Sequence, residues 1–456
     1  MRTPLLALCL AAVAGCTTTR TAPPTPATRP AASSTGDASP PPVASPPDLG
    51  KPLRLADLLP ILLERNPAVR AARARLEAAA ERHPQAISLP DPMVEGTYFA
   101  KNAMDPGNSF ARWNLMVSQD FPFPTVLSLR GEAATKEAQA EALRYEAAVR
   151  DAVADLKDVE AERAYLAATS SVQAALRDVY RRFAEVARGD LATGRTRLPE
   201  AFRAESLLAQ AGYELTLVEE IRRVEDQRLR ALLALPPSAP LGDPADAPPP
   251  AGLTVDLDEL ARRALEHNQE LLEAGVQVEA AEIGTRRARW EYAPMFSIGA
   301  GEMKNDDFDM ETGRTRDSTV VTFGLTIPLW VPAKAAGVRE AAARARAARA
   351  DEAGRRERLL ADVARTGFRL RNAGRLATLY GSELVPQAEK ALLRSQSMMK
   401  EGKESLSSSL ELAATWQQLR IAELRAVADQ AQAVAALERL LGTSLAPAPA
   451  SEGAGR

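Results

Sequence analysis

An internal duplication limits the possible folds of this chain more than any other feature of its sequence. Residues of the two halves match in constant order, at an offset of 202 residues for the first pairs (268 − 66 = 202), then 206, and finally 208. The matches that carry the alignment are Asn66 with Asn268, Pro92-Met93 with Pro294-Met295, Phe121-Pro122 with Ile327-Pro328, Gly194 with Gly402, and Leu198 with Leu406. Pro, Gly and Asn have special backbone requirements, so their shared order predicts two copies of one structural unit.

Each half predicts a helix, two strands, a very long helix, a turn and a further helix. We expect the first repeat over residues 51–235 and the second over 251–445. A Pro-rich linker at 236–250 joins them, and a flexible tail follows at 446–456. The first helix should span residues 55–81 and be divided by Asn66-Pro67, because the residue before a proline is biased away from helical conformation.

The predicted strands rest on a period of two. Trp113, Leu115 and Val117 alternate with Arg112, Asn114, Met116 and Ser118. Apolar residues alternate with Thr and Gly over 321–327, and shorter partner strands begin near Val94 and Phe296. Such strands have one apolar and one polar face. The connecting loops, 101–109 and 303–317, are polar.

Proline-rich joints follow each pair of strands and lead into very long helices. About 65 residues without a strong helix breaker run from Val126 to Asp190, which corresponds to a helix of ~100 Å. The second copy, from Ala333 to Lys400, contains Pro386, which should kink it. Helices of this length predict coiled-coil struts rather than a globular core.

Composition excludes several classes of function. The formal net charge is −3, so no basic excess is available to bind nucleic acid. Two His and two Cys leave too few ligands for a His/Cys metal site, and the nine Met are scattered along the sequence. No nucleophile elbow, phosphate-binding loop or paired-carboxylate motif occurs. We therefore expect no catalysis, no cofactor and no metal centre.

The first 15 residues have the features of a signal peptide, with an apolar run from Leu5 to Ala14 that is too short to span a bilayer as a helix. The run ends in Val13-Ala14-Gly15-Cys16, which is typical of a bacterial lipobox and predicts acylation of Cys16. An ordinary cleavage site with an incidental cysteine is the alternative. Residues 16–50 would then form the lipid anchor and a Pro-rich tether.

Four strands per chain are too few for a closed barrel, since about eight is the usual minimum. An open sheet cannot sit in lipid, because its edge groups would lack hydrogen-bond partners. Either the sheets are small and soluble, or several chains share one barrel. Three chains would supply twelve strands, with the polar faces lining a water-filled lumen.

On these features the chain resembles the TolC-like outer-membrane efflux ducts over about residues 51–445. The resemblance implies a mainly α fold with a small β part: a homotrimer with a twelve-stranded outer-membrane β-barrel continued by a periplasmic α-helical barrel. It implies a passive conduit that docks to a periplasmic adaptor and an inner-membrane pump. Residues 89–100 and 118–134 resemble the heavy-metal-cation branch, although Thr125-Val126 stands where that branch usually has Gly-Lys.

The resemblance also assigns roles to the two helix-to-helix turns, where each Gly suits the left-handed residue that ends a helix. The expected adaptor-docking residues are Gly194, Arg195, Leu198, Gly402, Lys403 and Leu406. The expected residues of a periplasmic gate are Glu200, Glu404, Ser408 and Glu411. Ordinary helix caps and solvated acids are the alternatives.

Two other classes of protein remain possible at this point. A periplasmic adaptor lipoprotein also has a long α-hairpin, but it has only one, between the halves of a small β-rich domain. A purely structural coiled-coil lipoprotein would not need two strand hairpins. The duplication and the alternating strands favour the duct.

Overall fold

The computed structural model describes residues 49–98, 111–194, 196–245, 256–305, 308–309, 314–315, 318–401 and 403–445. The first repeat contains α2 (Leu55–Arg65), α3 (Pro67–Ala80), α4 (Arg82–Ile87), β1 (Met93–Tyr98), β2 (Ala111–Phe121), α5 (Pro124–Ala192) and α6 (Leu198–Leu232). The second contains α7 (Leu257–His267), α8 (Gln269–Trp290), β3 (Met295–Asn305), β4 (Phe308–Asp309), β5 (Arg314–Thr315), β6 (Ser318–Thr326), α9 (Val331–Thr378), η1 (Leu379–Leu384), α10 (Val385–Lys400) and α11 (Leu406–Leu441). The predicted order of elements is confirmed in both repeats.

Asn66 and Asn268 show why the repeat keeps asparagine at this position. The Asn66 side chain accepts hydrogen bonds from the amides of Ala68 and Val69 and so caps α3, while its Nδ2 donates to Leu232 O at 2.9 Å. Asn268 caps α8 in the same way and donates to Leu440 O at 2.9 Å. Each asparagine therefore starts one helix and fastens it to the end of the last helix of its own repeat.

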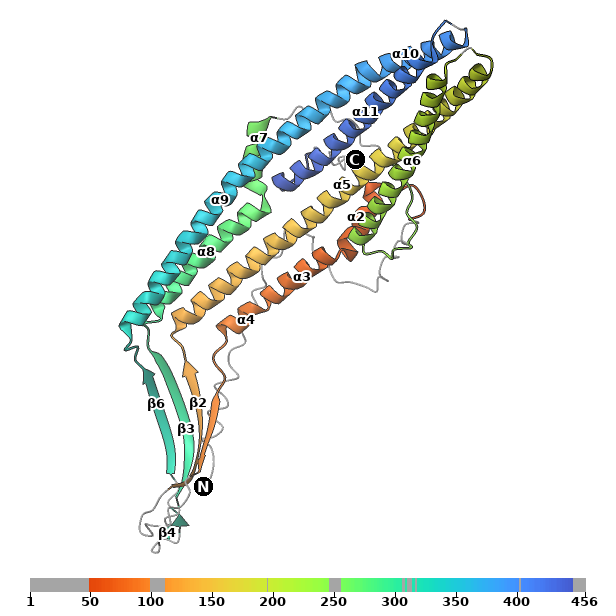
Figure 1. The fold of residues 1–456 in the computed structure, drawn as a ribbon. Helices are drawn as coiled ribbons and strands as arrows, with labels where there is room; N and C mark the ends of the chain where they lie inside the picture. Colours follow the sequence, from red (N-terminus) through yellow and green to blue (C-terminus); the bar gives the residue numbers. More distant parts are fainter. Residues whose placement is uncertain are drawn as a thin grey trace, which may run out of the picture. The chain divides into compact units, whose positions relative to one another are not determined.

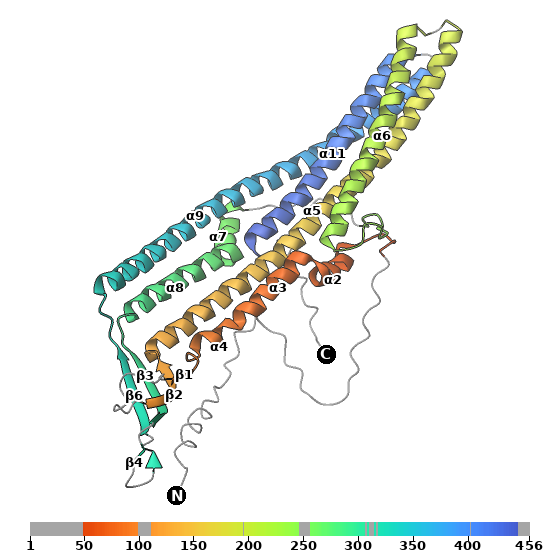
Figure 2. The same cartoon turned by 60° about the horizontal axis from the view of Figure 1, so that its bottom comes forward.

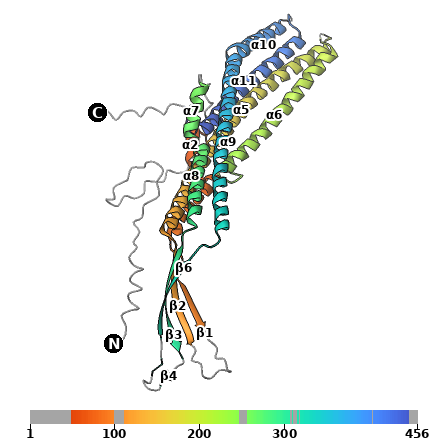
Figure 3. The ribbon, with the colours of Figure 1, turned by 90° about the vertical axis from the view of Figure 1, so that its left-hand side faces the viewer.

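The two long helices differ. Helix α5 is continuous over 69 residues, which is ~100 Å, and Pro124 in its first turn needs no amide partner. In the second repeat a π-helical segment, η1, separates α9 from α10, and Figure 3 shows the ribbon changing direction there. Pro386, the second residue of α10, has no amide hydrogen to donate to the carbonyl of Ser382, so the preceding turn widens to accommodate the missing hydrogen bond. The predicted interruption is present, and it lies just before the proline.

Strands β1, β2, β3 and β6 form one antiparallel sheet in that order, so β2 and β3 join the two repeats. One prediction was wrong in its extent: residues 303–305 belong to β3, and β4 pairs with β5 inside the expected loop 303–317. Ile327, expected in the last strand, lies beyond the end of β6, before Pro328 ends the pairing. The expected loop 101–109 lies outside the described residues.

Each strand of the sheet is adjacent in sequence to a helix, and the helices keep the order of the strands. Helix α4 leads into β1, β2 leads into α5, α8 leads into β3, and β6 leads into α9. Figures 1 and 2 show α3, α5, α8 and α9 side by side next to the sheet, and neighbouring members of this series are in contact. A four-stranded layer thus continues as a four-helix layer.

Beyond this layer the helices pair as two hairpins, α5 with α6 and α10 with α11, and α11 also packs on α5. Their shared core contains Leu176, Tyr180, Phe183, Leu392 and Leu410 together with many alanines. The alanines allow close approach of the helix backbones. Burial raises the pKa of Tyr180 to about 12. No helix among the described residues is long and apolar enough to cross a membrane.

Arg163 fastens the segment between the repeats to α5 and α6. Its side chain is 1% exposed and donates to Asp226 at 2.8 Å, Glu160 at 2.7 Å and the carbonyl of Gly242 at 2.7 Å. The segment 241–245 also pairs with residues 49–53, through hydrogen bonds from Gly242 N to Leu49 O and from Ala245 N to Leu53 O. A Cβ at Gly242 would lie 1.8 Å from Lys51 O, so only glycine fits this close approach.

Candidate functional site

One face of the sheet is apolar and open to its surroundings. The register places Val94, Val117, Ala300 and Val321 in one row across the four strands. The exposed large apolar side chains of this face are Val94, Tyr98, Leu115, Val117, Phe296, Ile298, Val321, Phe323 and Leu325. An apolar surface of this extent is typical of contact with lipid or with another protein.

Along β2 the apolar side chains of this face extend over about the height of the hydrocarbon layer of a membrane, whereas β3 carries Glu302 and Lys304 on the same face, opposite Leu115 and Trp113. Trp113 and Phe121 are eight residues apart on β2 (121 − 113 = 8), which is ~27 Å along the strand. Trp113 pairs with Tyr98 at one end. Beyond the other end, the rings of Phe123 and Trp290 stack with centroids 5.2 Å apart, and Trp330 is exposed. Aromatic residues at both ends of an apolar band ~25 Å tall are characteristic of outer-membrane strands.

The opposite face of the sheet is polar and carries small residues. Its polar members are Glu95, Thr97, Asn114, Ser118, Asp120, Ser297, Ser318, Thr322 and Thr326. Gly299, Gly301 and Gly324 also lie on it, and a Cβ at any of them would collide with a neighbouring strand or side chain. Strands β1 and β6 each pair on one side only, so the sheet ends in two open edges.

The turn between α5 and α6 has the predicted form. Gly194 has φ +71°, the left-handed conformation that glycine adopts without steric cost, and nothing lies within 4 Å of its missing side chain. Leu198 opens α6 and is 68% exposed. The predicted docking residue Arg195 lies outside the described residues.

The equivalent turn between α10 and α11 differs in one respect. Lys403 is exposed, its amide donates to Met398 O at 2.9 Å, and its Nζ pairs with Glu401 at 2.8 Å. Leu406 is only 8% exposed, and it belongs to the core that the two hairpins share. Gly402 lies outside the residues with defined placement. The two leucines matched by the repeat therefore lie in different environments, since Leu198 is exposed and Leu406 is buried.

The predicted gate residues lie in α6, in the turn before α11 and in α11 itself. Glu411 is exposed and pairs with Arg203 of α6 at 3.3 Å, and Arg203 also donates to Ser407 at 3.2 Å. Ser408 donates its amide to the capping Ser405 at 3.2 Å. The side chains of Glu200 and Glu404 are half-buried. The ion pair thus brings Glu411 together with a charged group of the other hairpin.

Arg203 was missed in the sequence, although a signal for it exists. Arg203 and Glu411 are 208 residues apart (411 − 203 = 208), the same offset that pairs the two glycines and the two leucines of the turns. They occupy equivalent positions in the two repeats and carry opposite charges. Such a pair can link the two hairpins where the repeat brings equivalent helices together.

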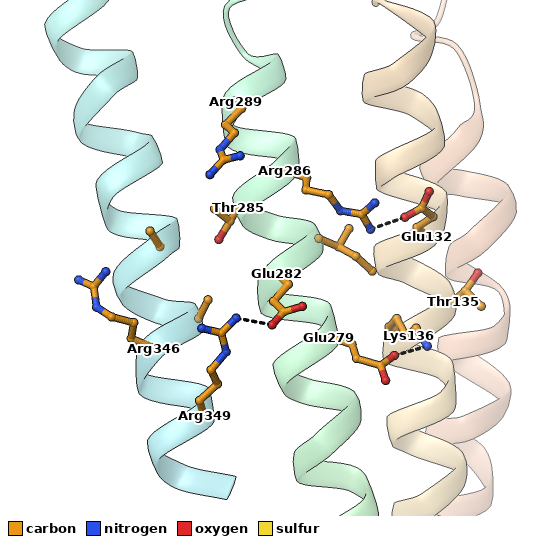
Figure 4. Close-up of a pocket in the computed structure, with 13 residues that line it drawn as sticks. Glu132, Thr135, Lys136, Glu279, Glu282, Thr285, Arg286, Arg289, Arg346 and Arg349 are labelled. Atoms are coloured by element: carbon orange, nitrogen blue, oxygen red, sulfur yellow. Dashed lines mark hydrogen bonds and ion pairs between the residues drawn. The ribbon is translucent and has the colours of Figure 1, made fainter. Parts of the chain in front are cut away.

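Ion pairs also connect three neighbouring helices near the sheet, along a groove of about 730 Å³ over α8 (Figure 4). Arg286 of α8 pairs with Glu132 of α5 at 2.8 Å, and Glu282 of α8 pairs with Arg349 of α9 at 2.5 Å. Glu279 of α8 pairs with Lys136 of α5. These contacts favour the observed helix order and form no catalytic arrangement. Within the parts of the chain that the structure describes, no three His, Cys, Asp or Glu side chains could hold a metal ion.

Several solved outer-membrane proteins have the same fold. The outer membrane protein VceC of Vibrio cholerae aligns with a TM-score of 0.72 at 20% identity, covering 86% of this chain and 97% of its own. A membrane protein from Pseudomonas aeruginosa aligns at 0.74 and 18% identity, covering 92% and 97%. CusC, which forms a transmembrane channel, aligns at 0.72 and 15% identity, covering 86% and 92%. No curated protein matches the sequence.

The sequence itself matches a family model. The model of the outer membrane efflux protein family matches residues 58–235 and 260–443, which together make up most of the chain. The two matched stretches correspond to the two structural repeats. The chain is a member of the outer membrane efflux protein family.

Proposed function

We propose that this protein is the outer-membrane channel of a tripartite efflux system, a passive conduit from a periplasmic adaptor and an inner-membrane pump to the exterior. The observation that carries the proposal is the sheet itself. It has a largely apolar face that reaches membrane height along β2, a polar face and two open edges, and it continues strand by strand into long helices. A layer of this kind is one segment of a tube.

A homotrimer would close this tube. Three copies supply twelve strands, and β6 of one copy would pair with β1 of the next, so that no edge group lacks a partner in lipid. The helical layer has matching edges. Helix α6 exposes an apolar series, Phe202, Tyr213, Leu217, Ile221 and Val224, while α9 and α10 expose Phe368 and Leu393. Contact between α6 of one copy and α9 and α10 of the next would bury the exposed apolar residues of both edges.

Conductance tests the proposal directly. Protein extracted in mild detergent and added to a planar bilayer should form discrete ion-conducting channels without any energy source. Absence of conductance from correctly folded protein would rule out the conduit and favour the alternatives, a periplasmic adaptor or a structural coiled-coil lipoprotein.

The two turns are the proposed adaptor-docking sites, through Gly194, Arg195, Leu198, Gly402, Lys403 and Leu406. Leu198→Ser should weaken adaptor binding about tenfold, because an exposed leucine at the centre of an interface contributes roughly 1–2 kcal/mol. Assembly of the channel itself should be unchanged, since Leu198 contacts little within its own copy. Binding of the purified adaptor, measured by surface plasmon resonance, checks this. Equal affinity of the two proteins would exclude Leu198 from the interface.

The proposed gate involves Glu411 with Glu200, Glu404 and Ser408, and Arg203 belongs with them. Glu411→Gln leaves three Arg203 side chains unpaired in a trimer, so ion selectivity should shift toward anions. Arg203→Gln leaves three carboxylates, and selectivity should shift toward cations. Reversal potentials in a salt gradient measure both shifts. Two variants with the wild-type reversal potential would show that this pair lies away from the ion path.

Cys16 is the proposed lipid anchor at the outer membrane, with residues 1–15 as the signal peptide and 16–50 as anchor and tether. The support is the lipobox, and Thr17 is not the aspartate that retains bacterial lipoproteins in the inner membrane. Cys16→Ser should eliminate incorporation of a palmitate analogue during growth. Equal labelling of the wild type and the variant would contradict the assignment.

Heavy-metal cations are the proposed cargo. The support is the resemblance of residues 89–100 and 118–134 to the cation branch, and the fold similarity to CusC, which is one neighbour among several. Thr125-Val126 departs from that branch, so drugs or other small molecules are the competing cargo. Susceptibility of a deletion strain to silver, zinc and cationic drugs, with and without the gene restored, distinguishes them.

A further inference from the structure

Four of the nine methionines lie on the polar face of the sheet. The register places Met93 opposite Ser118, Met116 opposite Glu95 and Gly301, Met303 opposite Asn114 and Ser318, and Met295 opposite Thr326. Met93 is 61% exposed and Met295 is 37% exposed. Apolar side chains are unfavourable on a wet surface. Apart from these four thioethers and Val320, the described part of the face consists of Ser, Thr, Asn, acidic residues and glycines, so the methionines call for an explanation.

Three of these methionines form a continuous series across the strands. Met93, Met116 and Met303 are diagonal neighbours on β1, β2 and β3, and diagonal Cβ atoms are ~7 Å apart, within reach of long side chains. Glycine keeps the surface beside Met116 open, because a Cβ at Gly301 would lie only 3.2 Å from the Met116 Cβ. The Met116 sulfur accepts a hydrogen bond from Thr322 Oγ1 of β6 at 3.6 Å, so its side chain reaches across β3.

The charges nearby suit a cation. Glu95 lies directly opposite Met116, and Asp120 is on the same face. Among the described side chains of this polar face, which exclude Arg112 and Asn305, there is no lysine or arginine. Thioethers are soft ligands that select Cu(I) over hard cations such as Na⁺ and Mg²⁺, and they carry no proton that a metal must displace.

We propose that Met93, Met116 and Met303 form a transit site for soft monovalent cations, Cu(I) or Ag(I), on the lumenal face of the sheet. The proposal rests on the proposed conduit, and it names the cargo chemistry that the lumen favours. One site per copy gives three in a trimer. Met93 is exposed and Met116 and Met303 are half-buried, so the site stays open to the lumen and can release the ion, which a conduit requires. The series escaped sequence reading because its members come from three strands in two repeats.

Silver ions provide the test. Binding of Ag⁺ to the detergent-purified protein is measured by isothermal titration calorimetry in chloride-free buffer at pH 7 and pH 5. Met116→Leu keeps side-chain volume and removes the sulfur, so folding should be unaffected. The variant should raise the Kd for Ag⁺ at least ~10-fold, and the triple variant with Met93→Leu and Met303→Leu should lose the site. Met398→Leu, in the last turn of helix α10, is the matched control and should leave this Kd unchanged.

Equal Ag⁺ binding by the wild type and the triple variant would overturn the proposal, and so would a loss of Ag⁺ affinity in Met398→Leu as large as that in Met116→Leu. An Ag⁺ affinity that falls steeply at pH 5 would also overturn it, because it would indicate carboxylates as the ligands. Conductance measurements distinguish an error in the thioether site from an error in the proposed conduit. A triple variant that conducts like the wild type, with unchanged Ag⁺ binding, refutes only the thioether site. A wild-type protein that does not conduct refutes the conduit itself.

Discussion

Val117→Lys should prevent assembly of the protein in the outer membrane, whereas Ser118→Lys, the adjacent substitution, should not. Val117 lies in the middle of the apolar band on the central strand β2, and a lysine facing lipid at mid-depth costs ~2–4 kcal/mol per copy, or ~6–12 kcal/mol for three copies. Ser118 points to the opposite, polar face, where a lysine remains hydrated. Outer-membrane fractionation, followed by electrophoresis with and without heating, compares the two variants.

The paired design controls for strand propensity and backbone hydrogen bonding, since the two residues are neighbours on one strand. Normal assembly of Val117→Lys would mean that the apolar face does not contact lipid. Equal failure of both variants would mean that β2 tolerates no lysine, and the assignment of the two faces would lose its support.

Arg163→Ala should destabilise the protein by ~3–5 kcal/mol, because removal of one partner from a buried ion-pair network leaves charges without compensation. Arg163 holds Asp226, Glu160 and the Gly242 carbonyl together. Hydrogen exchange should rise at the Gly242 and Ala245 amides, which bond the N-terminal segment. Arg228→Ala is the matched control: it removes an exposed pair with Asp158 and should cost at most ~1 kcal/mol.

The loss of stability caused by Arg163→Ala should depend on pH in a defined direction. Burial raises the pKa of Glu160, and Arg163 opposes that rise. Without Arg163, the pKa of Glu160 in the folded state rises further above its value in the unfolded state. The variant therefore loses stability as the pH increases through that folded-state pKa. The difference in stability from the wild type should therefore shrink at acidic pH. A loss of stability that stays constant between pH 4 and pH 7 would show that Glu160 does not contribute to the stabilising interactions of Arg163.

Much of the fold could be predicted from local patterns in the sequence. The Asn-Pro break, the alternation in β2 and β6, and the uninterrupted run of α5 each depend on neighbouring residues, and each is confirmed. The repeat predicted that the same elements recur. Its physical basis became visible only in the structure, where Asn66 and Asn268 fasten equivalent helices.

Other features depend on contacts between distant residues, which local patterns do not specify. The pairing of β2 with β3 sets which methionines share a face, and the burial of Leu406 depends on where α10 and α11 pack. The π segment η1 arises from the way a helix absorbs a proline, which can be a kink or a widened turn. Arg203 beside Glu411 needed both the offset of the repeat and the proximity of the two hairpins.

The number of chains that share the tube tests the central claim most directly. Multi-angle light scattering on protein extracted in mild detergent, corrected for bound detergent, gives the mass of the assembled complex. The account predicts three times the mass of one chain, because three copies close a twelve-stranded barrel and cover both open edges of each sheet. A stable monomer that keeps its folded sheet in detergent would contradict the shared barrel and, with it, the proposed conduit.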